Sequence, residues 1–223
     1  MKIPKIHLRE RVRKTSDLFA PGTILFERKK DFINQAIIEA QNLFWEEQNQ
    51  VSKWSHIGFF GSDGMFYEST VKLTWHKFVY GIRITSPEKL IKEILKEDEC
   101  IGLQYDLAIS GKKLKQATEQ ARNMWRKGYL YGGLELFGTL LVLLRWKLVR
   151  DPKKRKKLLK THNPFERRKN LYCIAFVAEC LQKADLSYLE VEPSIATVDH
   201  GWFTKIKHKK RIIELSRDSA SEE

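Results

Sequence analysis

The sequence has few cysteines and no spacing of ligand residues that would build a metal centre. It holds three cysteines in 223 residues, an odd number and too few for a disulfide framework, without the close pairs of a zinc site. No set of His, Asp and Glu residues has metal-ligand spacing either, so we expect no metal and no cofactor. Free thiols in a reducing, cytoplasmic setting are the expectation.

Long hydrophobic segments are also scarce. Residues 1–20 are basic but contain no apolar core of a signal peptide, so we expect a basic tail there. The most apolar stretch is 130–149, yet its uninterrupted run, 136–144, is nine residues long and far short of the roughly 20 that cross a bilayer. The stretch therefore predicts a buried or interfacial helix.

Positive charge is abundant and unevenly distributed. The formal net charge is +13, and residues 150–169 hold ten Lys or Arg against two acidic residues, a net +8. Such a run is either a solvated surface loop or a site for phosphate on nucleic acid or on anionic lipid. No aromatic residue interleaves the lysines before Phe165, so a base-stacking platform for nucleic acid is not indicated. Peripheral binding to an anionic membrane through 150–169 stays open.

The hydrophobic periodicity predicts one α+β domain over 20–215, with a basic insertion near 150–169 and a frayed tail at 216–223. Ser86 and Asn170 are the expected N-caps of two of its helices, and Gly128 is the expected stop of a third. Strand-like segments are 21–27, 56–60, 65–70, 71–75, 78–84 and 100–109, and helical segments are 31–48, 86–97, 110–127 and 170–186.

The segment 52–70 contains a histidine in a strand where an apolar residue is usual. A three-residue loop at 62–64, with Gly64 in the left-handed conformation, would pair Gly61 with Met65 and Gly58 with Glu68. His56 would then share a face with Glu68, one diagonal step away and within reach of its side chain. A four-residue loop from 61 to 64 would instead bring Tyr67 and Ser69 to that face. Both registers are compatible with the sequence.

Cys173 lies in the first turn of the last predicted helix if Asn170 is its cap. Unpaired N–H groups and the helix dipole favour a thiolate there, which makes Cys173 a candidate nucleophile with His56 as its base. The alternative is that Cys173 is a small buried hydrophobic residue, the commonest role of a free cysteine. Cys180 lies two turns further on among apolar neighbours, and we interpret it as core packing.

Several of these motifs together resemble a known family. "PGTILFE", "SHIGFF" followed by "FYES", and "NLYCIAFVAECL" are similar to motifs of permuted papain-fold cysteine amidases, the YiiX-like branch of the NlpC superfamily. "YLYGG", which begins at Tyr129, is similar to a Tyr-x-x-Gly-Gly element of unpermuted relatives. The histidine precedes the cysteine, which is the order of the permuted branch.

The resemblance implies a circularly permuted papain-like (NlpC-type) fold, in which an antiparallel sheet packs against helices. It implies a thiol protease or amidase with Cys173 as nucleophile, His56 as base and Glu68 as the residue that orients the base. Tyr129 and Tyr172 are the expected substrate-binding residues. The implied substrate is a peptide or a peptidoglycan-like amide.

Two other functions remain open. The same chemistry could act on an acyl lipid at a membrane surface, as a thioesterase or acyltransferase, since the apolar residues 130–149 adjoin the basic run. The third hypothesis is a non-enzymatic basic module that binds a membrane or nucleic acid, with Cys173 as core packing. His76 is an alternative base or orienting residue, and His200 is expected in a turn near the pocket.

Overall fold

Six strands form one sheet, and every neighbouring pair in it is antiparallel. The computed structural model describes residues 19–28, 32–45, 52–74, 77–97, 100–106, 110–158, 165, 169–184, 196–198 and 210–215. The sheet order is β4-β3-β2-β1-β5-β6, so the first and last strands of the chain lie in the same sheet. The strands are β1 (Ile24–Arg28), β2 (His56–Phe60), β3 (Phe66–Thr74), β4 (Lys77–Thr85), β5 (Cys100–Asp106) and β6 (Lys210–Leu215). The predicted α+β class with an antiparallel sheet is confirmed.

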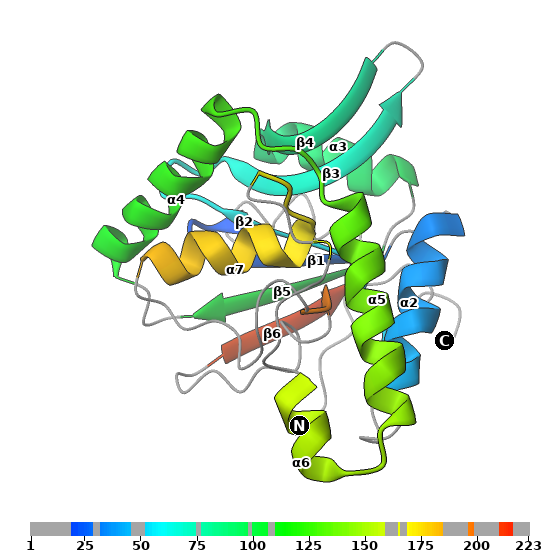
Figure 1. Ribbon diagram of the computed structural model, residues 1–223. Helices are drawn as coiled ribbons and strands as arrows, with labels where there is room; N and C mark the ends of the chain where they lie inside the picture. The colour runs from blue at the N-terminus through cyan, green and yellow to red at the C-terminus, as the bar shows by residue number, and fades with distance from the viewer. Residues whose placement is uncertain are drawn as a thin grey trace.

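Helices cover both faces of this sheet. In Figure 1, α4 and α7 lie in front of the sheet, α3 lies behind β3 and β4, and α2 and α5 stand together at one end. The helix α6 follows α5 directly. The helices are α2 (Phe32–Trp45), α3 (Pro87–Glu97), α4 (Gly111–Arg126), α5 (Gly133–Leu148), α6 (Pro152–Leu158) and α7 (Cys173–Lys183).

Two hydrophobic clusters, one on each face, hold these layers together. Alternate residues of a strand point to opposite faces, so Ile57 and Phe59 of β2 pack with α7 while Phe60 packs with α3. The ring of Phe59 meets Phe176 of α7 with a centroid distance of 6.2 Å. On the other face, Phe60 joins Leu90 and other side chains of α3. The face of each strand residue therefore decides which helix it meets.

The hairpin between β2 and β3 has the three-residue loop. Gly64 has φ 74°, and the Gly61 N–H donates to the Met65 carbonyl at 2.9 Å. Gly58 pairs with Glu68, as the count from that loop predicted. Gly58 has no room for a side chain, because a Cβ there would lie 2.3 Å from the Phe66 ring. The register that brings Glu68 to the face of His56 is confirmed, and the four-residue alternative is wrong.

Two of the three expected helix ends are found where the sequence placed them, and one is not. The Ser86 carbonyl accepts from the Leu90 N–H at the start of α3, and Gly128, with φ 67°, follows the end of α4. The prediction of Asn170 as the cap of the last helix is wrong. Asn170 forms an isolated bridge with Leu130 instead, and Tyr172 is the N-cap of α7.

Other boundaries also differ from the sequence prediction. The segments 65–70 and 71–75, expected as separate strands, belong to one continuous β3. The strand β6 was not predicted. Part of the basic run is helical, as α6, and the remainder beyond 158 lies outside the described residues except for Phe165 and Lys169. The expected tails up to residue 18 and from 216 to 223 also lie outside them. None of the described helices has the length and apolarity needed to traverse a bilayer.

The loop of the β2–β3 hairpin is tied to α4 by an aspartate. The Asp63 carboxylate accepts from the Tyr67 hydroxyl at 2.7 Å, from Arg122 at 2.6 Å and from the Met65 N–H at 3.1 Å. Burial by itself would raise the pKa of Asp63, but these hydrogen bonds outweigh it and hold the pKa below its ordinary value. Burial and the Asp63 carboxylate raise the pKa of Tyr67 to about 12, which keeps its hydroxyl a donor.

We predict that Asp63→Asn lowers the free energy of unfolding by about 1 kcal/mol near neutral pH, since it loses charge-assisted bonds at a half-exposed site. A lowered carboxyl pKa stabilises the fold above the unfolded value of about 3.9. That stabilisation is lost as the pH falls through the folded value. Urea titrations should therefore show a difference between the two proteins at pH 7 that shrinks below about pH 4. A difference independent of pH would contradict this explanation.

Candidate active site

Cys173 is the first residue of α7, two residues closer to the start of the helix than a cap at Asn170 would have placed it. Its N-cap, Tyr172, has an extended backbone and makes no side-chain capping bond. The first N–H groups of α7 are therefore not satisfied by a cap side chain, and the helix dipole adds a partial positive charge at the thiol. The side chain is 3% exposed. The structure thus places the Cys173 sulfur at the positive end of the dipole of α7.

The residues before Cys173 are held by three separate elements. The Ser69 hydroxyl of β3 donates to the Leu171 carbonyl at 2.5 Å, and Leu130 bridges Asn170. The Tyr172 hydroxyl donates to the Ala196 carbonyl at 2.8 Å and accepts from Thr139 of α5 at 3.1 Å. The start of α7 is thus fixed to the sheet, to the segment before α5 and to α5 itself.

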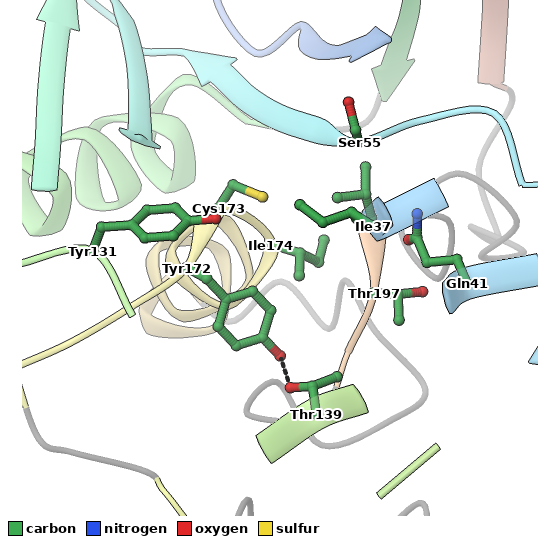
Figure 2. Close-up of a pocket in the computed structure, with 10 residues that line it drawn as sticks. Ile37, Gln41, Ser55, Tyr131, Thr139, Tyr172, Cys173, Ile174 and Thr197 are labelled. Atoms are coloured by element: carbon green, nitrogen blue, oxygen red, sulfur yellow. Dashed lines mark hydrogen bonds between the residues drawn. The ribbon is translucent and has the colours of Figure 1, made fainter. Parts of the chain in front are cut away.

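A small pocket lies at this helix start. Figure 2 shows the Cys173 sulfur directed toward the side of the pocket where Ser55 and Ile37 lie. Among the described residues the lining contains no charged side chain and is made largely of aliphatic groups and tyrosine rings. The lining residues are Ile37, Gln41, Ser55, Tyr131, Thr139, Tyr172, Cys173, Ile174, Thr197 and Val198.

Tyr131 is the tyrosine of "YLYGG" that lines this pocket. Its ring packs edge-on against Tyr80, with 6.2 Å between centroids. Burial raises the pKa of Tyr131 well above its ordinary value, and the proximity of a negative charge on Cys173 raises it further. Tyr131 therefore keeps its proton at neutral pH and can donate a hydrogen bond beside the sulfur. The resemblance to the Tyr-x-x-Gly-Gly element pointed to Tyr129 instead. Tyr129 packs against the core cluster and is not among the lining residues.

His56 and Glu68 are in direct contact, as the hairpin register predicted. The imidazole Nε2 lies 2.6 Å from Glu68 Oε2, and both side chains are buried. The other oxygen of Glu68 accepts from Arg83 Nε at 2.6 Å, and Arg83 also pairs with Glu93 of α3 at 2.9 Å. Burial alone would lower the pKa of Arg83, but the negative charges of Glu68 and Glu93 outweigh it and raise that pKa. Glu68 is therefore flanked by the histidine and by a permanent cation.

The pair His56–Glu68 is adjacent to the pocket of Cys173 but is not part of its lining. Ser55, the preceding residue, lines the pocket, whereas His56 shares with Glu68 the sheet face that α3 covers. Among the described residues no hydrogen bond joins the imidazole to the sulfur. The structure thus brings together His56 with Glu68 and Cys173 with Tyr172, and it places these two groups on opposite faces of the sheet.

Glu27 completes a group of potential metal ligands around His56. Its Oε2 lies 4.0 Å from His56 Nε2, and one ligand atom from each of Glu27, His56 and Glu68 lies within 4.8 Å of the others. Sequence spacing did not indicate this group, because the three residues come from three different strands and meet only through strand pairing. The ion pair with Arg83 gives Glu68 a structural role that requires no metal.

The structure accounts for two further candidate residues, and two others lie outside the described part of the chain. Cys180 is fully buried, and burial raises the pKa of its thiol well above the ordinary value, in agreement with core packing. His76 and His200 lie outside the described residues. Tyr172 also lines the pocket. Its hydroxyl is hydrogen-bonded to Ala196 and Thr139, so the residue offers its ring to the pocket.

We predict that Glu68→Gln destabilises the fold by about 3 kcal/mol, because it leaves Arg83 with one carboxylate partner in a buried site. Glu93→Gln is the matched control. Glu93 is more exposed than Glu68, so its loss should cost under about 1 kcal/mol. The urea midpoints of the two variants provide the comparison. Equal losses would mean that Glu68 does not organise this cluster.

Comparison with known proteins gives no indication of the function, so the assignment depends on the geometry of the site. No family model matches the chain, and no curated protein matches it in sequence. The positions of Cys173, Tyr131, His56 and Glu68 therefore carry the assignment that follows.

Proposed function

We propose that the chain is a cysteine hydrolase that cleaves amide bonds, with Cys173 as its nucleophile. The observation that carries this proposal is the position of Cys173: it is the first residue of α7, and it lines a pocket beside a protonated tyrosine. A helix N-terminus favours the thiolate, and a pocket gives the substrate access to it. Cys180, seven residues further along the same helix, has neither feature.

In the proposed reaction the Cys173 thiolate attacks the carbonyl carbon of the amide, which forms a tetrahedral oxyanion. The leaving nitrogen takes a proton as the carbon–nitrogen bond breaks, and water then hydrolyses the thioester. The N–H groups at the start of α7 are donors for the oxyanion, and the Tyr131 hydroxyl is a further donor.

His56 is the proposed proton acceptor and donor, with Glu68 as the residue that orients it. Glu68 binds Nε2, so Nδ1 is the nitrogen that would exchange the proton with the thiol. This role requires the imidazole to come closer to Cys173 than it lies here, and catalytic hydrogen bonds often tighten only when substrate is bound. The His56 side chain points to the sheet face opposite that of Ser55, which lines the pocket, so this role requires a rearrangement of the start of β2.

The arrangement of elements also supports the proposed circularly permuted papain-like fold. The chain passes from β1 to the histidine strand β2, then to Glu68 on β3, and reaches the cysteine helix α7 late. This is the order that the resemblance to permuted NlpC-type amidases implies. We propose a cytoplasmic location, in line with the free thiols of Cys173 and Cys180.

A peptide or peptidoglycan-like amide is the first candidate substrate. The pocket favours a second candidate, an acyl lipid whose ester or thioester bond is attacked by the same thiolate. Ile37, Ile174 and Val198 line the pocket, and none of the described lining residues is charged. The apolar character of this lining matches an acyl chain better than a polar peptide backbone, and the pocket would have to widen to admit either. Matched anilide and thioester substrates with the same acyl group would separate the two.

We predict that iodoacetamide modifies Cys173 faster than Cys180 near pH 7, since only the thiolate displaces iodide and burial keeps the Cys180 thiol protonated. Peptide mapping after partial reaction identifies the modified residue. If His56 is the base, His56→Gln should move the pH profile of Cys173 alkylation toward that of an ordinary thiol, with a pKa of about 8.5.

Far-UV circular dichroism of His56→Gln shows whether the variant is folded, and alkylation is compared only if it is. An unchanged pH profile in the folded variant would remove His56 from the mechanism and leave the helix start as the activating group. Equal reaction rates for Cys173 and Cys180 in the native protein would remove Cys173 as the nucleophile.

We also predict that Tyr131→Phe lowers turnover by about 10²-fold, as expected when an oxyanion donor is lost. Tyr80→Phe is the matched control, because Tyr80 packs against the Tyr131 ring but does not line the pocket. Turnover is followed by release of the amine or thiol from the matched substrates. A loss shared by both variants would indicate that the tyrosine rings support packing and that the Tyr131 hydroxyl has no catalytic role.

A further inference from the structure

The helix α5 exposes a row of large apolar side chains on one side. The row consists of Leu134, Phe137, Leu141, Leu144 and Leu148, which are between 39% and 83% exposed. Their spacing alternates between three and four residues, so they lie along one face of the helix. We call this row the α5 stripe. A contiguous apolar row of this kind on a surface marks an interaction site.

The opposite side of α5 is buried in the protein. Thr139, Val142 and Trp146 face inward, and Thr139 donates to the Tyr172 hydroxyl at the start of α7. The helix is therefore apolar on both sides. On the outer side Phe137 contacts the Phe165 ring, with 6.1 Å between centroids, but Phe137 is still 53% exposed and the stripe as a whole remains open to a partner.

Positive charge lies next to the stripe and is held in a fixed position. The Arg155 guanidinium stacks over the Trp146 ring at 4.5 Å, and its Nε donates to the Val149 carbonyl, which ties α6 to the end of α5. Asp151 accepts from the Lys153 N–H at 2.8 Å and so caps α6. Residues 134–158 hold eight basic and two acidic residues, a net charge of +6. The exposed cations are Arg145, Lys147, Arg150, Lys153, Lys154 and Lys157.

We propose that the α5 stripe and the cations of α6 together form a docking surface for an anionic lipid bilayer. The stripe inserts at the level of the headgroups and the cations bind lipid phosphates. This surface goes beyond the hydrolase function and needs no activity of Cys173. Of the apolar run 136–144, Phe137, Leu141 and Leu144 belong to the stripe, and the side chain of Leu140 lies outside the described residues.

Charge complementarity selects the bilayer over a second copy of the chain. Arg145 and Lys147 flank the stripe on the exposed surface, and a second copy would present the same cations. An anionic membrane supplies the opposite charge along the whole surface. The helix is 16 residues long, about 24 Å, so it lies in the interface and is too short for a hydrocarbon core of about 30 Å.

The test is sedimentation of the full chain with vesicles of phosphatidylcholine alone or mixed with phosphatidylserine, across a salt series. We expect binding to the anionic vesicles that falls as salt rises above about 0.1 M and leaves a salt-resistant remainder. Replacing Lys153, Lys154 and Lys157 by Gln should lower the partition coefficient about 10²-fold at low salt. Replacing Leu141 and Leu144 by Gln should remove the salt-resistant part.

Matched control variants carry the same changes on α4. Lys112, Lys115 and Lys127 are exposed lysines there, and Trp125 is an exposed apolar residue. Their replacement by Gln should leave vesicle binding unchanged, as should Cys173→Ser. Three results would overturn the proposal: negligible binding to both vesicle types, an equal loss in the α4 controls, or a dimer in light scattering that dissociates when Leu141 and Leu144 are changed.

Discussion

The buried carboxylate of Glu68 is the interaction on which the arrangement of the central strands depends. One of its oxygens meets His56 of β2 and the other meets Arg83 of β4, so a single side chain on β3 joins three neighbouring strands. Arg83 extends the contact to Glu93 and so to α3. A buried carboxylate is stable only when its charge is paired and its oxygens are hydrogen-bonded. The apolar clusters on either side can pack freely because this polar group is satisfied within the sheet.

The same residue explains why a histidine begins β2. A histidine on an apolar strand is most often a satisfied core residue, and the contact with Glu68 satisfies His56 whether or not it takes part in catalysis. The two roles are compatible, because a base must be oriented before it can act. What separates them is the position of Cys173, which lies on the pocket side of the sheet, next to Ser55. The structure therefore describes an oriented histidine on one face of the sheet and a helix-start thiol on the other.

Local patterns in the sequence predicted what depends on local chemistry. The left-handed Gly64 determines the loop length, the loop length determines the register, and the register determines that Glu68 meets His56. Helix periodicity likewise placed Cys173 at the start of a helix. Arg83 was missed because its partner comes from the pairing of β3 with β4, which no spacing along the chain encodes.

Two errors at the site have the same physical origin. The motif match selected Tyr129, but residues two apart in an extended segment face the same way, so the match alone does not say which tyrosine reaches Cys173. The bridge between Leu130 and Asn170 aligns this segment with the residues that lead into α7: the Leu130 N–H donates to the Lys169 carbonyl, and the Leu171 N–H donates to the Leu130 carbonyl. These bonds hold the residues on both sides of Asn170, and Tyr172 is the N-cap of α7. A long-range contact thus overrides a local capping preference.

The helix α5 links the proposed surface to the proposed site. Its inner face gives Thr139 to the Tyr172 hydroxyl, and Tyr172 caps the helix that carries Cys173. Its outer face carries Leu141 and Leu144, about one and a half turns or less along the helix from Thr139. A membrane bound to the outer face of α5 would therefore contact the helix whose inner face makes the hydrogen bond to Tyr172. For an acyl-lipid substrate this arrangement would bring the pocket to the surface where the substrate lies, whereas a soluble amide substrate would gain nothing from it. The apolar lining of the pocket and the apolar outer face of α5 thus favour the same class of substrate.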